Sequence, residues 1–230
     1  MRRAVVNIER LIGIGAVTNG TLQTTGSSSQ SYSHTVEAQQ NRCLLVIAQI
    51  NSDSRSIDGI TYNGVAMTAL ASNTITIGGG ADITQHIFYL SNPATGSNTV
   101  AVSYSSSLGA SDSANSSAVC LWNVHPTPAE DNTSNNNSSD VTSTINMTTN
   151  FPDDIVFDAC TTSNNQSQVV PAGQTLLLTC TTGPGGVNDD PCLVSYARGN
   201  RAFSGQPSMS RTWTGSTQFT HTIWALKKMQ

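Results

Sequence analysis

The sequence predicts an all-β protein that folds as an antiparallel β-sandwich. Runs rich in aliphatic, aromatic and β-branched residues recur at intervals of roughly ten to twenty residues, and Gly-, Pro-, Asn- and Asp-rich stretches separate them. In several runs apolar residues alternate with polar ones, which is the period of a strand buried on one face. Beyond the first residues, no window carries the apolar stripe of a sustained helix. These observations favour a sandwich or a barrel.

The first thirty residues differ from the rest. They consist of a basic, apolar segment, "MRRAVVNIERLIGIGAV", and a polar linker. Glu9 and Arg10 interrupt the apolar run and no small-x-small cleavage site closes it, so the segment does not fit a signal peptide. We expect residues 1–30 to form an extended or short helical arm that anchors the molecule, and residues 31–230 to form the β-sandwich domain.

Each strand of the sandwich is expected where a run of strand-forming residues ends in a turn signal. The clearest connection is Asn63-Gly64, because a two-residue hairpin needs positive φ at both positions. The expected strands span residues 32–38, 43–50, 57–62, 65–71, 83–90, 99–104, 118–124, 141–147, 155–161, 175–181, 192–196, 209–213 and 219–227.

Two patterns predict how these strands are covered. The runs "CLLVIAQI" and "VCLWNV" are apolar throughout, which indicates central strands covered on both faces, by loops or by neighbouring subunits. In contrast, "AEDNTSNNNSSDVTSTINMTTN" is a polar, low-complexity stretch. It predicts a long surface loop that becomes a strand only in its second half.

Composition excludes several classes of function. Charged residues make up 10% of the chain against about 25% in typical proteins, so neutral polar residues must form most of the surface. A net charge of −4 argues against nucleic-acid binding. No apolar run reaches the roughly 18 residues of a membrane span. Basic residues gather at both ends, where they form either an arm that docks on an acidic partner or ordinary solvated termini.

No catalytic group is predicted, and we expect that the protein is not an enzyme. The sequence contains no G-x-S-x-G motif, no phosphate-binding loop and no recognisable acid–base pair. His86 and His221 fall inside expected strands, where a polar residue on the outer face explains them. The five cysteines lack C-x-x-C spacing and lie mostly in apolar runs. They predict buried thiols, with one or two disulfides left open.

Two weaker candidate sites concern ligands. Asp189-Asp190 lies in a loop where carboxylates could hold Ca²⁺, although the spacing matches no EF-hand or nonapeptide metal repeat, and no other cofactor is expected. Trp213 lies near a turn, and an exposed ring there could stack on a sugar. The alternative for Trp213, as for Trp122 and Trp224, is a place in the core.

The order of motifs resembles a jelly-roll-like β-sandwich module of tailed-bacteriophage structural proteins. The first element is a "Y-x-G-x-x-M-T" hairpin and the second a "YL-x-NP-x-TG-x-x-T-V-x-V" strand pair. The first is carried by Tyr62, Gly64, Met67 and Thr68, and the second by Tyr89, Leu90, Asn92, Pro93, Thr95, Gly96, Thr99, Val100 and Val102. The resemblance covers residues 32–228 and leaves the arm outside. These motifs are structural, so they identify a scaffold better than a function.

Two functional hypotheses follow. The first is a virion structural protein, located on the phage particle as a capsid-surface decoration or cement protein. It would act through contacts with other capsid or tail subunits, and with copies of itself in a homo-oligomer. In this hypothesis the arm is an assembly anchor, with Arg2, Arg3, Arg10, Leu11 and Ile12 as its contact residues. The second is a glycan-binding module, on a phage tail or neck appendage or as a secreted domain, which would use Trp213.

Overall fold

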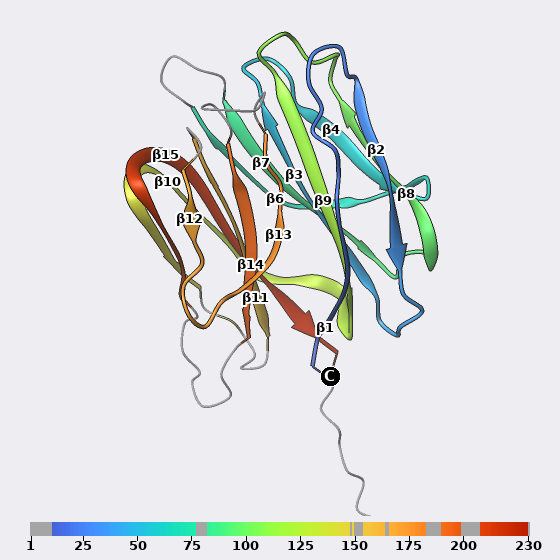
Figure 1. Ribbon diagram of the computed structural model, residues 1–230. Helices are drawn as coiled ribbons and strands as arrows, with labels where there is room; N and C mark the ends of the chain where they lie inside the picture. Colours follow the sequence, from blue (N-terminus) through green and yellow to red (C-terminus); the bar gives the residue numbers. More distant parts are fainter. Residues whose placement is uncertain are drawn as a thin grey trace, which may run out of the picture.

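The computed structural model describes residues 11–76, 82–147, 149, 154–163, 166–182, 190–198 and 208–229, without the side chains of residues 128–138. Every regular element in this part of the chain is a β-strand (Figure 1), which confirms the all-β prediction. No helix capable of crossing a membrane occurs among these residues.

The strands form three antiparallel sheets, which we call A, B and C. Sheet A has the order β1 (Gly13–Asn19), β9 (Ser113–Trp122), β3 (Cys43–Asn51), β7 (Ile83–Ser91) and β6 (Thr68–Ile75). Sheet B has the order β2 (Ser29–Val36), β8 (Gly96–Tyr104), β4 (Ile57–Tyr62) and β5 (Val65–Ala66). Sheet C has the order β10 (Val124–Asn146), β15 (Ser208–Lys228), β11 (Ile155–Thr162), β14 (Cys192–Arg198) and β13 (Thr175–Thr179), and β12 (Gln168–Val169) also pairs with β15.

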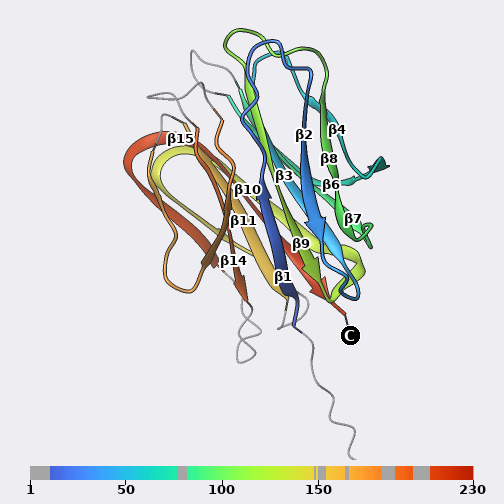
Figure 2. The ribbon, with the colours of Figure 1, turned by 45° about the vertical axis from the view of Figure 1, so that its right-hand side comes forward.

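Sheet A is the middle layer of a three-layer sandwich (Figure 2). Alternate residues of β3 serve its two faces. Leu44 and Val46 pack against sheet B, and Leu45 and Ile47 pack against sheet C. The prediction that "CLLVIAQI" is covered on both faces is therefore confirmed. The cover is a third sheet of the same chain, which the sequence pattern alone could not distinguish from a loop or a neighbouring subunit.

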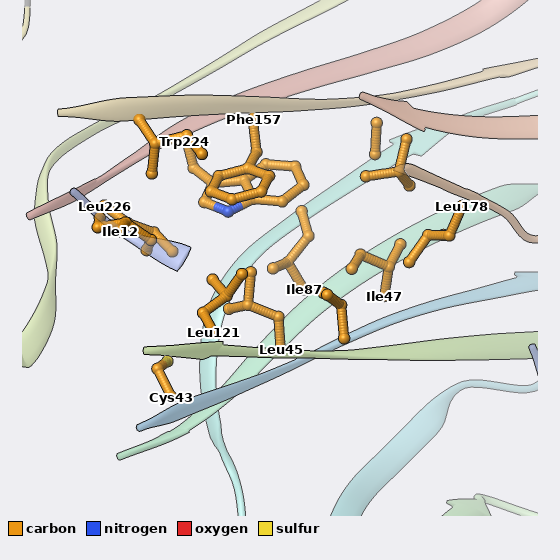
Figure 3. Packing of buried hydrophobic residues seen from close by; sticks show 14 of the residues in the cluster. Ile12, Cys43, Leu45, Ile47, Ile87, Leu121, Phe157, Leu178, Trp224 and Leu226 are labelled. Carbon is orange, nitrogen blue, oxygen red and sulfur yellow. The ribbon is translucent and has the colours of Figure 1, made fainter. Parts of the chain in front are cut away.

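The core between sheets A and C contains the largest buried aromatic pair. Trp224 of β15 and Phe157 of β11 stack with ring centroids 5.7 Å apart. Figure 3 shows the two rings above Leu121 and Leu45 of sheet A. Because Trp224 is 1% exposed, its interpretation as a core residue is confirmed. Truncating such a side chain typically costs about 3–5 kcal/mol, so this contact is a major part of what holds sheet C to sheet A.

β10 and β15 form a long two-stranded ribbon that bends back over sheet C (Figure 1). Beyond the bend, Met209 and Ile145 pack on Val156 and Ile223, which face away from sheet A. The ribbon therefore covers the outer face of its own sheet. The loop expected in the first half of "AEDNTSNNNSSDVTSTINMTTN" is wrong, because β10 runs without a break to Asn146 and pairs with β15. The strand expected in the second half is present as the end of β10. Ladder hydrogen bonds need no apolar side chains, and the composition therefore concealed the strand.

Asparagines shape the sharp connections. Asn63 and Gly64 both have positive φ and join paired residues Tyr62 and Val65, as the hairpin prediction requires. Asn123 has a φ of 59° and is the single residue between β9 and β10, where the chain passes from sheet A to sheet C. Its side chain donates a hydrogen bond to the Leu11 carbonyl at 3.0 Å.

The expected N-terminal arm is shorter than residues 1–30. Ile12 is 1% exposed in the core between sheets A and C, and Gly13–Asn19 pair with β9 as the edge strand of sheet A. The glycines permit this close packing, since a Cβ on Gly13 would lie 1.9 Å from the Trp122 ring. From Ile12 onward, the segment therefore belongs to the sandwich.

Candidate functional site

The ribbon closes a polar cluster against the outer face of sheet C. Asp158 of β11 and Ser195 of β14 are opposed in the ladder, and His221 lies on the neighbouring β15. The folded ends of the ribbon bring Ser143 and its ladder partner Arg211 over them. All five residues are at most 2% exposed. We call them the Asp158 cluster.

Asp158 is the centre of the cluster. Its Oδ1 atom accepts hydrogen bonds from Arg211 Nη2 at 2.6 Å, from Ser195 Oγ at 2.8 Å and from the Ser195 backbone N–H at 3.1 Å. The contact with Arg211 is an ion pair between fully buried side chains. Charge-assisted bonds of this kind are needed to offset the large desolvation cost of two buried charges.

His221 links the carboxylate to a serine. Its Nε2 atom lies 3.0 Å from Asp158 Oδ2, and its Nδ1 atom lies 2.8 Å from Ser143 Oγ. A neutral imidazole with its hydrogen on Nε2 satisfies both contacts, because Nε2 donates to the carboxylate and Nδ1 accepts from the hydroxyl. This order of serine, histidine and carboxylate is the one that activates nucleophilic serines.

Burial decides how this arrangement is interpreted. A nucleophilic hydroxyl must contact an external substrate, whereas Ser143 is 2% exposed beneath the ribbon. Arg211 also connects the cluster to neighbouring segments, because its Nη1 atom donates hydrogen bonds to Gln174 Oε1 and to the Ser210 carbonyl. Gln174 lies directly before β13, so the cluster and Gln174 together join the ribbon to β11, to β14 and to the segment that leads into β13. The cluster therefore has the arrangement of a structural contact that holds the ribbon against sheet C.

A second polar cluster joins sheets A and C. Gln49 donates to Thr182 Oγ1 at 2.5 Å and accepts from Thr161 Oγ1 at 2.9 Å, while Gln85 donates to Thr161 Oγ1 at 3.1 Å. Gln49 and Gln85 are 0% exposed. Buried amides of this kind favour one register between packed sheets, because another register would leave them unpaired.

The expected assembly residues fall in different environments. Arg2, Arg3 and Arg10 lie outside the described residues. Leu11 is 52% exposed and remains available for contact with another protein. Ile12 is a correction to the expectation, because its side chain is already buried against sheet C.

Trp213 has no open ring face for a sugar, contrary to the stacking expectation. It is 5% exposed, and its indole N–H donates to the Asp140 carbonyl at 2.7 Å. Its ring centroid lies 4.9 Å from that of Phe219. Trp213 therefore packs within the bend of the ribbon, which is the core alternative that the sequence left open.

The aspartate pair is only partly described. Asp189 lies outside the described residues, and Asp190 is 3% exposed. Asp190 Oδ2 accepts a hydrogen bond from Asn51 Nδ2, and the Asp190 backbone bridges to Thr182. Among the residues whose positions are described, no group of three or more His, Cys, Asp or Glu side chains is arranged to hold a metal ion.

Two neighbouring strand edges form a further surface feature. β1 ends sheet A and β13 ends sheet C, and these two edge strands lie side by side. Val17 on β1 is 39% exposed and Leu176 on β13 is 49% exposed. The side chain of Glu37 accepts a hydrogen bond from Ala16 N at 2.7 Å and so covers only part of the β1 edge. We call this surface the β1/β13 edge.

Comparison with known proteins gives no match for this chain among protein-family models, curated proteins or solved structures.

Sequence reasoning missed the Asp158 cluster. Asp158 in "VFDACT" and Arg211 in "MSRTWT" are charged residues inside strand-like runs of a chain with few charges. That anomaly was the available signal. His221 does lie on an outer sheet face, as expected, but the ribbon then covers that face and buries it. Only the fold of the ribbon reveals the contact between Ser143 and His221.

Proposed function

We propose that this chain is a structural protein that acts by burying surface against other protein subunits, including copies of itself. The specific form of the proposal is a capsid-surface decoration or cement protein on the particle of a tailed bacteriophage. The resemblance of residues 32–228 to a jelly-roll-like β-sandwich module is part of this proposal. The observation that carries it is the β1/β13 edge, where two neighbouring edge strands expose apolar side chains.

Edge strands favour association for a physical reason. Their outward N–H and C=O groups can pair with a strand of another chain, and proteins that remain monomeric usually protect such edges. Here two edges lie together, so a partner strand could continue one sheet while its side chains contact the other. Val17 and Leu176 would supply the apolar contacts. Leu11, which immediately precedes the buried Ile12, would extend the same surface.

The interior supports a contact function over a catalytic one. The groups with the order of a serine nucleophile, Ser143, His221 and Asp158, are enclosed and mutually hydrogen-bonded. Trp213, the residue that favoured a glycan-binding module, is buried as well. A scaffold that presents shape and strand edges requires neither an open active site nor a ligand pocket.

Light scattering on the purified chain tests the proposal. We expect a homo-oligomer for the intact chain, and a monomer for the double variant Val17→Lys/Leu176→Lys, because charges on the edges oppose strand pairing. Val65→Lys is the matched control, since Val65 is 54% exposed but lies on β5 of sheet B.

A truncated protein tests the arm separately. Removal of residues 1–10 leaves Ile12 and β1 in place, so the sandwich should still fold while any contribution of Arg2, Arg3 and Arg10 to assembly is lost. A monomeric intact chain at high concentration would contradict self-association. Peptides of this chain in purified tailed-phage particles would support its placement on the virion, and their absence from the particles would contradict it.

A further inference from the structure

Two of the five cysteines face each other across neighbouring strands. The backbone N–H of Cys180 donates to the Cys192 carbonyl at 2.9 Å, and the N–H of Cys192 donates to the Cys180 carbonyl at 3.2 Å. Reciprocal bonds of this kind define a hydrogen-bonded antiparallel pair, in which the Cα atoms lie about 5.5 Å apart. Disulfides usually join Cα atoms that are about 4.4–6.8 Å apart. The backbone therefore already has the separation that a disulfide needs.

The two side chains also share one environment. Directly opposed residues of a ladder project from the same face of the sheet. Cys180 and Cys192 both belong to the core between sheets A and C, and both are fully buried. The next opposed residues, Thr182 and Asp190, also exchange two backbone hydrogen bonds. The ladder therefore continues past the cysteines and fixes their register.

No other two cysteines are placed in this way. Cys43 and Cys120 lie on neighbouring strands but face opposite sides of sheet A, because Cys43 packs towards sheet C and Cys120 towards sheet B. Cys160 is opposed to Leu193 and packs with Trp213 on the outer side of sheet C. The five cysteines are free thiols in this structure.

We propose that Cys180 and Cys192 are a redox pair, which forms a cross-strand disulfide on exposure to a low-molecular-weight disulfide such as oxidised glutathione. One protein thiolate attacks the oxidant and releases one small thiol, leaving a mixed disulfide on the protein. The second protein thiolate attacks the protein sulfur of that bond and releases the second small thiol. The two cysteines lose two protons and two electrons, and one oxidant disulfide is reduced to two thiols.

The disulfide would fix the edge of sheet C covalently. It would tie β13, the edge strand of sheet C, covalently to β14 beside the β1/β13 edge. In the closed sheet the reaction should be slow, because exchange requires the thiolate. Burial raises the pKa of Cys192 to about 11 and raises the pKa of Cys180 well above its usual value. We therefore expect oxidation to require local opening of β13, which an edge strand undergoes more readily than a central one.

Mass spectrometry provides the test. The chain is incubated with oxidised glutathione, or refolded in its presence, and the remaining thiols are alkylated in denaturant. We expect two fewer alkylated cysteines than in the reduced protein. Proteolytic cleavage before Asp189 or Asp190 separates Cys180 from Cys192, and cleavage after Leu176, Leu177 or Leu178 separates Cys180 from Cys160. A linked peptide pair that dithiothreitol separates would therefore identify the bond.

Variants sharpen the assignment. Cys180→Ser and Cys192→Ser should each abolish the linked peptides, and Cys160→Ser should retain them because Cys160 lies on the other face of the sheet. If either serine variant fails to fold, the peptide map of the unaltered chain still decides the question. Full alkylation of all five cysteines after both treatments would overturn the proposal, as would a dominant bond between any other two cysteines.

Discussion

At the scale of single residues, burial controls the charge of two histidines. His34 of β2 and His86 of β7 both have a pKa below the usual value. Desolvation is the main cause in each case, and Glu37 opposes it only for His34. Both rings are thus held neutral, since a buried imidazolium would lose its hydration. The Nδ1 atom of His34 lies 2.9 Å from Thr18 Oγ1 on β1, so the two side chains are hydrogen-bonded.

This burial predicts a pH dependence of stability. When the pH falls through the ordinary histidine pKa of about 6.5, the unfolded chain takes up protons that the folded chain does not. The free energy of unfolding should therefore fall between pH 7 and pH 5, by at most about 1.4 kcal/mol per pH unit for each histidine. Urea unfolding across this range measures the slope. The double variant His34→Gln/His86→Gln should show a flatter dependence, and an unchanged slope would contradict the assignment.

Residue chemistry also explains which turns could be predicted. Asn63 precedes a glycine between two strand-like runs, and its hairpin was predictable. Asn123 has the same left-handed backbone, yet it lies inside the continuous run "VCLWNV". Nothing in that run marks the passage from sheet A to sheet C. The corner depends on Leu11 and on Met229, whose backbone N–H donates to the Asn123 carbonyl at 2.9 Å.

At the scale of elements, the ribbon of β10 and β15 depends on its buried charges. Asp158 belongs to β11 within sheet C, and Arg211 belongs to the part of β15 that lies beyond the bend. Their ion pair therefore holds the folded end of the ribbon against the sheet. Loss of either partner leaves an uncompensated buried charge, and this costs more than the pair itself contributes.

We accordingly predict that Asp158→Ala and Arg211→Met each destabilise the protein by about 3–5 kcal/mol. The double variant should lose less than the sum, since it leaves neither charge alone. Arg55→Ala is the control, because Arg55 forms a partly exposed contact of 3.6 Å with Asp112, and such surface pairs contribute at most about 1 kcal/mol. Urea unfolding provides the comparison. Strictly additive losses at Asp158 and Arg211 would show that the two charges are not coupled.

The ribbon is also where element prediction failed. Strand cores such as 43–51, 57–62 and 155–162 were predictable because their apolar residues record what they pack against. In β10, the residues that continue the strand are Asn, Ser and Asp, and only the backbone ladder with β15 makes them a strand. The Asp158 cluster was hidden for the same reason, because the fold of the ribbon brings its members together.

At the scale of the whole molecule, the first half of the chain forms two of the layers and the second half forms the third. Residues 13–122 form sheets A and B, and residues 124–228 form sheet C, which covers the free face of sheet A. The apolar character of β3 and β9 on both faces required two covers, and the sequence showed that need without showing its source. With both faces covered, strand edges are the surfaces left for pairing. The β1/β13 edge is therefore the assembly surface that we propose.

Hydrogen–deuterium exchange at low and high protein concentration tests that claim most directly. Amides of residues 13–19 and 175–179 should exchange more slowly at high concentration, because a partner strand would pair with them. The opposite edge, represented by residues 68–75 of β6, serves as the internal reference and should not change. Protection confined to other strands, or none at all in a sample that light scattering shows to be oligomeric, would contradict the β1/β13 edge as the interface.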